Sequence, residues 1–183
     1  NTKILSVNRR GKQIIFKLSN PYSLLLHLRM TGKVLLRNQF VSPNKHDHVI
    51  LHLDNNISLF YNDTRKFGRF TLTKNTQSIL NKLGPEPLGE DFIFSEFSQK
   101  LANTQRKIKA LLLDQHIVAG LGNIYTDEAL WEARIHPEQP AHLISIKKQK
   151  LLFHGIQNVL RKGIKNNGTS LGDGQTNYTS SNS

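Results

Sequence analysis

The chain has 183 residues, enough for one domain or two small ones, with 25 Lys and Arg against 13 Asp and Glu for a formal net charge of +12. It contains no cysteine, which excludes disulfides, thiolate zinc sites and cysteine nucleophiles within these residues. No apolar run reaches the roughly 18–20 residues of a membrane span. The basic excess favours a polyanionic partner through counterion release, with a basic domain that is merely soluble as the alternative.

Residues 1–75 have the pattern of short antiparallel strands separated by turn signals such as Asp54-Asn-Asn56. Because Asn1–Lys17 is basic and alternating, unlike a signal peptide, we interpret it as a strand entered part-way and the chain as a fragment at that end. Many short strands at this spacing predict an antiparallel sandwich or barrel. The strand segments, rich in β-branched and aromatic residues, are Gln13–Leu18, Ser23–Leu28, Lys33–Arg37, His48–Leu53, Ile57–Tyr61 and Phe67–Thr73.

A double-proline connector, Leu83-Gly-Pro-Glu-Pro-Leu88, separates this region from one with helical spacing. Phe94, Phe97 and Leu101 lie three and four residues apart, and a last helix is predicted from about Ile146 to Ile164. The predicted fold is therefore α+β, an antiparallel β-sandwich lobe followed by a helical domain. The predicted parts are a β domain over 1–82, a linker over 83–90, a helical domain over 91–167 and a flexible tail over 168–183.

The most informative segment joins two helices through a Gly-x-Gly turn. An apolar helix ending near Leu111-Leu112 precedes Gly120-Leu-Gly122, and a second helix opens at Asn123. The first backbone N–H groups of such a helix are unpaired and lie at the positive end of its dipole, so they suit a phosphate. Asn123 is also a good N-cap residue, a structural role that coexists with phosphate binding.

Further motifs occur in order and at compatible spacing along most of the chain. They are Arg9-Arg-Gly-Lys12, His27-Leu-Arg-Met-Thr-Gly32, Lys45-His-Asp-His48, Asp63-Thr-Arg-Lys-Phe-Gly68, Leu83-Gly-Pro-Glu-Pro87, Leu113-Asp-Gln115, Gly120-Leu-Gly-Asn-Ile-Tyr125 and Ile135-His-Pro137. From about Asn1 to Asn167 the chain resembles the formamidopyrimidine-DNA glycosylase / endonuclease VIII family, and its formamidopyrimidine branch in particular. The resemblance implies a β-sandwich followed by a helix-two-turn-helix domain, with DNA between the lobes.

By this resemblance we expect a parent base-excision repair enzyme, a DNA glycosylase with apurinic/apyrimidinic (AP) lyase activity. It would flip out and excise oxidised purines such as 8-oxoguanine and formamidopyrimidines from duplex DNA, as an intracellular, nucleoid-associated monomer. The family's nucleophile is an N-terminal proline followed by a glutamate, and its zinc lies in a four-cysteine ribbon. Neither is in this chain, so we expect no cofactor here, one zinc in the parent, and an inactive fragment. The alternatives are a non-catalytic damaged-DNA-binding protein of the same fold and an RNA-binding or ribosomal protein.

The resemblance assigns roles to four residues of the β region. Lys12 takes the position of the proton donor in β-elimination, with a solvated strand charge as the alternative. Met30 and Phe67 resemble a wedge that fills the space left by an extruded base, and Arg65 resembles the residue facing the orphaned partner base. Because Met and Phe more often lie in a core, that is the alternative for both.

Two histidines and three departures from the family pattern complete the β region. His46 takes a position that contacts the DNA backbone, with a structural polar contact as the alternative, and for His48 we favour the structural role. The two lack a third ligand, so we predict no metal site. Arg29 stands where the family usually has Gly, and Thr64 and Lys66 stand where Pro and Arg are usual. These departures bear on loop shape and opposite-base preference.

In the helical region the resemblance places Lys109 and Asn123 against the phosphate of the lesion. Lys109 on an ordinary amphipathic helix is the alternative. Tyr125 is expected to neighbour the phosphate or the flipped nucleotide. Glu128 lies on a mostly apolar stripe three residues before Trp131, so we expect its carboxylate to be partly desolvated. It would support the site near the N-terminal nucleophile or form an ordinary salt bridge.

Overall fold

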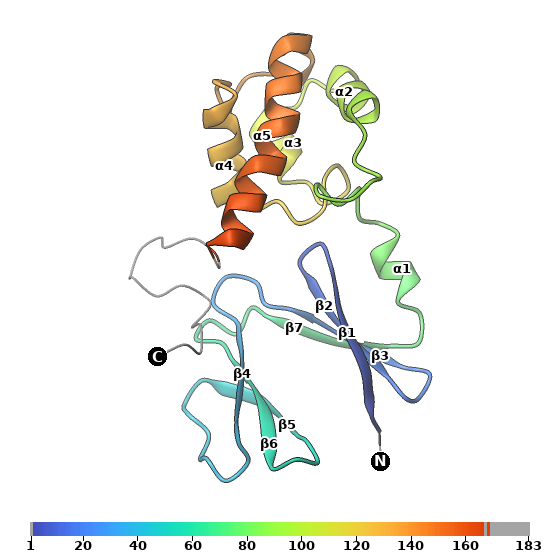
Figure 1. Cartoon of the computed structure of the whole chain (residues 1–183), viewed down its shortest axis with the longest axis vertical. Helices are drawn as coiled ribbons and strands as arrows, with labels where there is room; N and C mark the ends of the chain where they lie inside the picture. The colour runs from blue at the N-terminus through green and yellow to red at the C-terminus, as the bar shows by residue number, and fades with distance from the viewer. Residues whose placement is uncertain (1, 167, 169–183) are drawn as a thin grey trace. The chain divides into compact units, whose positions relative to one another are not determined.

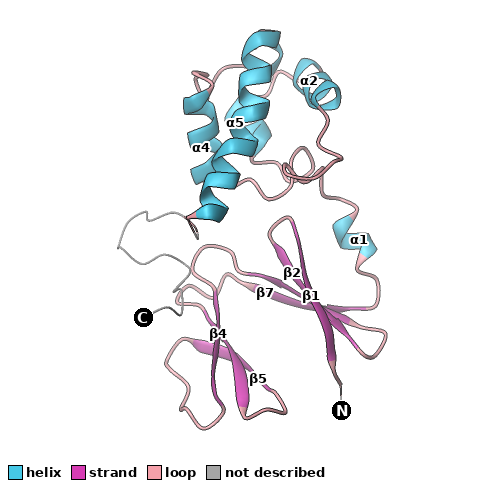
Figure 2. Cartoon of the chain, in the orientation of Figure 1, coloured by secondary structure: helices cyan, strands magenta, loops and turns pink. Residues whose placement is uncertain are grey.

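The structure is a computed structural model that describes residues 2–166 and 168. It divides into two compact units, Asn1–Thr76 and Gln77–Ser183 (Figure 1). The first unit contains strands and the second contains helices (Figure 2). The strands are β1 (Ile4–Arg10), β2 (Gln13–Leu18), β3 (Ser23–His27), β4 (Lys33–Asn38), β5 (Asp47–His52), β6 (Ile57–Asn62) and β7 (Arg69–Thr73). The helices are α1 (Gln77–Leu80), α2 (Phe94–Ala102), α3 (Ile108–Leu112), α4 (Asn123–Glu132), the 3-10 turn η1 (Ala141–Leu143) and α5 (Ile146–Lys165).

The first unit is a sandwich of two antiparallel sheets, with strand orders β1-β2-β3-β7 and β4-β6-β5. Each predicted strand segment overlaps an observed strand, with ends that differ by at most two residues. Phe16 and Leu26 of the four-stranded sheet share one core with Leu59 and Tyr61 of the three-stranded sheet. The expected antiparallel β-sandwich is therefore confirmed.

Strand β6 positions the site because it is buried on both faces between β4 and β5. The Tyr61 ring meets Phe70 of β7 edge-on, with centroids 5.0 Å apart, which ties the two sheets together. On the other face, the Arg37 guanidinium lies 4.9 Å from the centroid of Phe60. The end of β6 is consequently a rigid point from which the loop 63–68 leaves the sandwich.

The second unit is organised around α5, whose Leu152, Ile156 and Val159 are buried in its core. The predicted helix from about Ile146 to Ile164 is confirmed, whereas α1 and η1 were not predicted. Helix α4 packs along α5. Close approach depends on Gly163, because a Cβ there would lie 2.2 Å from the hydroxyl oxygen of Tyr125.

Two sequence-based expectations concern the ends of the chain and membranes. Of the predicted tail, residues 169–183 lie outside the described residues, and so does residue 167 of the predicted helical domain. Across residues 2–166 and 168, no helix is both long enough and apolar enough to cross a membrane.

Candidate nucleic-acid interface

The predicted wedge residues come together on two loops of the β unit. Met30 lies between β3 and β4, and Arg65 and Phe67 lie between β6 and β7. Arg65 Nη1 is 3.3 Å from Met30 Sδ, and the Arg65 guanidinium carbon is 4.7 Å from the Phe67 ring centroid. Met30 is 68% exposed and Phe67 is 53% exposed, so neither side chain belongs to the core. Their insertion into DNA stays a prediction.

Both loops are anchored on the buried carboxylate of Asp63. Oδ1 accepts a short hydrogen bond from the Thr31 hydroxyl and one of 3.2 Å from the Arg65 N–H. Oδ2 accepts from the Tyr61 hydroxyl at 2.7 Å and from the Gly68 N–H at 2.9 Å. Burial alone would raise the pKa of Asp63, but these hydrogen bonds outweigh it and hold that pKa well below its usual value. The carboxylate is therefore charged at neutral pH.

Two glycines allow the loops to close around the Tyr61 hydroxyl. A Cβ at Gly68 would lie 1.5 Å from that oxygen, closer than any side chain could approach. A Cβ at Gly32 would lie 2.8 Å from the same oxygen and 2.4 Å from the Leu28 carbonyl oxygen. Neither position can carry a side chain without displacing Tyr61 or the loop.

Lys12 lies among other cations of the β unit. Partial burial, followed by the charge of Arg29, lowers the pKa of Lys12. Burial, Arg29, Lys12 and Arg69 likewise lower the pKa of His27, which accepts a 3.0 Å hydrogen bond from the Arg29 N–H on Nδ1. A lysine with a lowered pKa is a stronger acid, as a proton donor requires. His27 belongs to a quoted motif but was assigned no role, because its nearness to Lys12 and Arg69 appears only in the folded chain.

Arg29 has a left-handed backbone conformation, with φ of +57°. A residue with a Cβ is strained there by about 1–2 kcal/mol, whereas glycine is not. Lys66 has the same conformation, with φ of +58°. At Arg29 the chain therefore carries a guanidinium on a strained backbone, next to His27 and close enough to Lys12 to lower its pKa.

The two histidines of the Lys45–His48 motif lie with ring centroids 6.5 Å apart, edge to face. His48 Nε2 hydrogen-bonds to the Asp63 carbonyl oxygen at 2.8 Å, which fits the structural role favoured for it. The backbone of His46 accepts a 3.0 Å hydrogen bond from the Asp63 N–H, and its side chain is half-buried. Within the described part of the chain, no group of three or more His, Asp or Glu is arranged to hold a metal ion.

In the helical unit, the turn between α3 and α4 is held by the side chain of Gln115. Its Nε2 donates to the carbonyls of Leu113 and Leu121, both at 3.0 Å, and its Oε1 accepts from the Gly120 N–H at 2.9 Å. Gly120 has φ of +83°, which explains glycine at that position. Gln115 was quoted in a motif without a role, because its partners become neighbours only once the turn has formed.

Helix α4 begins at Asn123, as predicted, but Asn123 is not its N-cap. Gly122 occupies that position in extended conformation, and no side chain caps the helix. Among the described residues, the backbone N–H groups of Asn123, Ile124 and Tyr125 have no acceptor. The positive end of α4 is therefore available to an anion.

Helix α3 differs, because its first N–H groups are already paired. The N–H of Ile108 donates to the Gln139 carbonyl at 2.9 Å and that of Lys109 to the Pro137 carbonyl at 3.1 Å. The Lys109 ammonium lies 2.8 Å from Oδ1 of Asp127 on α4. A phosphate that binds Lys109 therefore competes with this carboxylate, which sequence analysis did not foresee.

The prediction that the Glu128 carboxylate is partly desolvated is wrong. Glu128 is exposed and Trp131 is 85% exposed, whereas α4 buries the face that carries Thr126, Ala129 and Leu130. Thr126 and Ala129 have small side chains, so this face of α4 packs closely along α5 and the side that carries Ile124, Glu128 and Trp131 stays exposed. Glu128 is close enough to help raise the pKa of the half-buried Tyr125, after burial as the larger cause. Its supporting role stays a prediction.

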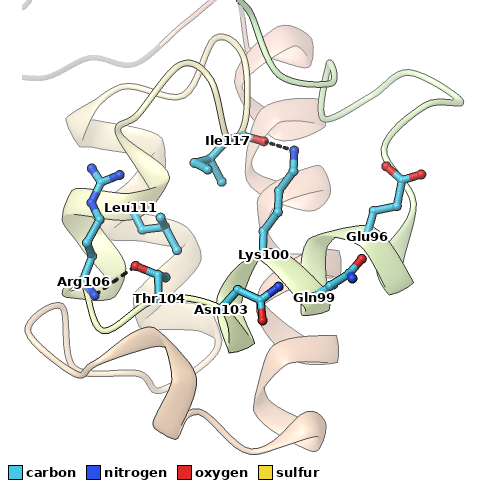
Figure 3. A pocket seen from close by; sticks show the side chains of 8 residues that line it. All are labelled: Glu96, Gln99, Lys100, Asn103, Thr104, Arg106, Leu111 and Ile117. Carbon is cyan, nitrogen blue, oxygen red and sulfur yellow. Dashed lines mark hydrogen bonds between the residues drawn. The ribbon is translucent and has the colours of Figure 1, made fainter.

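A hollow of about 490 Å³ lies beside α2 in the helical unit (Figure 3). It contains none of the predicted site residues. Its Lys100 ammonium donates to the Ile117 carbonyl at 3.4 Å, and its Arg106 pairs with Asp114 at 2.8 Å. These cations are thus already engaged. The lining residues are Glu96, Gln99, Lys100, Asn103, Thr104, Arg106, Leu111 and Ile117.

Two family models, each describing one domain of the same kind of enzyme, match the β unit and the helical unit. The Formamidopyrimidine-DNA glycosylase N-terminal domain matches residues 1–70, and the Formamidopyrimidine-DNA glycosylase H2TH domain matches residues 83–174. The chain belongs to the formamidopyrimidine-DNA glycosylase family. Family membership and the α+β fold, both predicted from sequence, are thereby confirmed.

Relatives and solved structures of the formamidopyrimidine-DNA glycosylase family agree with this assignment. The glycosylase of Protochlamydia amoebophila is 46% identical, covering 96% of this chain and 63% of that protein, and that of Herpetosiphon aurantiacus is 43% identical, covering 92% and 63%. The structure of Lactococcus lactis Fpg with DNA containing an abasic site is 41% identical, with a TM-score of 0.87 over 93% of this chain and 64% of that one. MutM with DNA containing carbocyclic 8-oxo-G is 42% identical, with a TM-score of 0.88 over 93% and 65%. The chain thus spans just under two thirds of the length of these relatives.

Proposed function

We propose that this chain is the DNA-binding body of a base-excision repair glycosylase with AP lyase activity, acting on oxidised purines in duplex DNA. The observation that carries the proposal is the exposed cluster of Met30, Arg65 and Phe67 on two anchored loops. Exposed apolar side chains held by a rigid base can fill the space that an extruded base leaves in the stack. The names of the relatives and the abasic and 8-oxo-G DNA in the related structures support the same function.

The proposed roles in DNA binding and catalysis are divided among residues of both units. In the β unit, Lys12 donates a proton during β-elimination and His46 contacts the DNA backbone. In the helical unit, Lys109 and the open start of α4 at Asn123 bind phosphate, with Tyr125 beside them. Glu128 supports the reaction rather than carrying it.

The partner is damaged or abasic duplex DNA, bound by a monomer inside the cell at the nucleoid. No cofactor is assigned to this chain. By the family resemblance, a zinc ion belongs to a ribbon of four cysteines, and the 183 residues contain no cysteine. The Schiff base belongs to an N-terminal proline, so the 183-residue chain alone is proposed to bind DNA without reacting.

Competition binding tests the choice of nucleic acid. The 183-residue chain is expected to prefer abasic duplex over undamaged duplex of the same sequence and over structured RNA. Met30→Ala should leave the affinity for undamaged duplex nearly unchanged and slow base extrusion, measured by 2-aminopurine fluorescence. Leu36→Ala is the matched control, because Leu36 is 66% exposed on β4 outside the cluster. A preference for RNA would overturn the proposal.

Borohydride trapping on 8-oxoguanine duplex tests the chemistry. A longer form of the protein that begins with Pro-Glu should form a covalent adduct, and the 183-residue chain should not. If the longer form binds abasic DNA without trapping, the non-catalytic alternative replaces the glycosylase. Robust trapping by the 183-residue chain would show that the nucleophile has been misplaced.

A further inference from the structure

We propose that Asp63 is the positioning residue of the wedge. The single carboxylate of Asp63 fixes the Met30 loop against the loop that carries Arg65 and Phe67. The two loops then act on DNA as a single rigid element. The DNA step rests on the proposed function, whereas the coupling of the loops rests on the hydrogen bonds alone. Asp63 is not a catalytic residue, because it is fully buried and acts through other residues.

The two loops need such a connection because neither is part of a sheet. One passes from β3 to β4 and the other from β6 to β7, so each crosses from one sheet of the sandwich to the other. Within the residues that the structure describes, no backbone–backbone hydrogen bond joins 28–32 to 63–68. Strand pairing joins the chain on both sides of the loops, between Lys33 and Asn62 and between His27 and Arg69. Between these paired residues, the hydrogen bonds that join the two loops come from side chains.

A single oxygen atom bridges the residues that flank the wedge. Oδ1 of Asp63 accepts from the hydroxyl of Thr31, which follows Met30 in the chain, and from the backbone N–H of Arg65. Oδ2 accepts from the Gly68 N–H, immediately after Phe67. Each wedge residue is therefore itself bonded to this carboxylate through its backbone or lies next to a residue that is.

A carboxylate suits this position better than an amide of the same shape. Two ionised oxygens offer about four acceptor sites and match the four donors, whereas an asparagine would turn an NH₂ group toward two of them. Charged hydrogen bonds are also roughly twice as strong as neutral ones, and burial protects them from water. The four donors together therefore specify aspartate.

Asp63 is itself held in place by His48 of β5 and by His46, which immediately precedes β5. Its backbone N–H donates to the His46 carbonyl at 3.0 Å, and its carbonyl oxygen hydrogen-bonds to His48 Nε2 at 2.8 Å. These bonds use the main chain and leave the carboxylate free for the loops. Asp63 is consequently a fixed point rather than a group that moves with either loop.

The test separates a positioning role from simple support of the fold. Thr31→Val removes one donor on the Met30 side and leaves the other three hydrogen bonds of Asp63 intact. The matched control is Ser58→Ala, because Ser58 is buried on β6 and its hydroxyl lies 2.8 Å from His52 Nδ1, away from both loops. Asp63→Asn is the stronger variant, and Thr31→Val keeps the test available if that variant fails to fold.

The first measurement needs no DNA. Met30 is the chain's one methionine, so a ¹³C-methyl label on methionine gives a single NMR signal from the wedge. Thr31→Val should shift this signal and raise the mobility of the methyl group, whereas Ser58→Ala should change neither. If the methyl signal and the methyl mobility in Thr31→Val match those of the unsubstituted 183-residue chain, the proposal is overturned.

The second measurement is the ratio of affinities for abasic and undamaged duplex. Thr31→Val should lower this ratio by about 3- to 10-fold when it is made in the unsubstituted 183-residue chain. It should have no further effect when Met30→Ala is already present. Equal losses in both backgrounds would reduce Asp63 to a support of the fold. If the parent chain shows no preference for abasic DNA, the proposed function fails, and the methyl signal still decides whether the loops are coupled.

Discussion

Each unit of this protein holds a site-bearing loop with one side chain, but the two side chains differ in chemistry. Asp63 in the β unit only accepts hydrogen bonds, and it joins Thr31 to a loop more than thirty residues later in the chain. Gln115 in the helical unit both donates and accepts, and all its partners lie between Leu113 and Leu121. A neutral amide is enough to close a local turn, whereas a charged group joins two distant loops. The charged connection is the stronger one, and it depends on pH.

The largest effect is expected for Asp63→Ala. Removing the carboxylate leaves several buried donors unpaired, each worth about 1–3 kcal/mol, so the β unit should lose about 3–5 kcal/mol of unfolding free energy. Calorimetry of the chain measures this loss. Asp54→Ala, at an exposed turn residue, is the control and should change the stability by less than about 0.5 kcal/mol.

A smaller loss is expected for Gln115→Ala in the helical unit. The Gly120 N–H and two carbonyls lose a neutral partner in a half-buried turn, which should lower the unfolding free energy by about 1–3 kcal/mol. The exposed Gln99 on α2 provides a matched control, Gln99→Ala. If Gln115→Ala proved more destabilising than Asp63→Ala, the contrast between the two connections would be reversed.

The pH dependence of stability should differ between the two connections, because the Asp63 carboxylate can be protonated and the Gln115 amide cannot. Because the pKa of Asp63 is lower in the folded state, its contribution is complete above the unfolded pKa of about 4 and is lost as the pH falls toward the folded value. Urea unfolding from about pH 5 to pH 2 should therefore show a falling stability that Asp63→Asn flattens. Asp47, whose pKa is also lowered because hydrogen bonds outweigh burial, accounts for part of the remaining slope. Gln115→Ala should keep the slope of the parent chain.

The smallest effect concerns cations that already have a partner. Lys109 is paired with Asp127, whereas no carboxylate among residues 2–166 and 168 forms an ion pair with Lys12. A surface ion pair is worth at most about 1 kcal/mol, so Asp127→Asn should strengthen DNA binding by up to about fivefold. Lys109→Ala should lower the salt dependence by about one unit.

The control for this comparison is Glu132→Gln, because Glu132 forms an exposed pair with Lys162 at 2.8 Å. It should leave DNA affinity unchanged. If Asp127→Asn still tightens DNA binding when Lys109→Ala is present, Asp127 does not compete with phosphate at Lys109. The salt titrations of the Lys109→Ala and Asp127→Asn variants can be done on the same duplex.

The strands and the long helix could be predicted because alternation and helical spacing are local properties of the sequence. The face of α4 could not, because packing on α5 buries Ala129 rather than the stripe that ends at Trp131. Met30 and Phe67 were found only through the family motifs, since their exposure is a tertiary property. Asp63 and Gln115 were quoted in motifs without a role for the same reason, because hydrogen bonds across a turn or between loops have no signature in residue order.

Arg29 makes stability and charge opposing design goals at a single position. An engineer who wanted a more robust scaffold would choose glycine there, and the backbone would relax from its left-handed strain. The same change would remove a guanidinium that helps make Lys12 more acidic. Thermal screening of variants at residue 29 would therefore select against the electrostatics of the site, so such screens need a second selection on DNA.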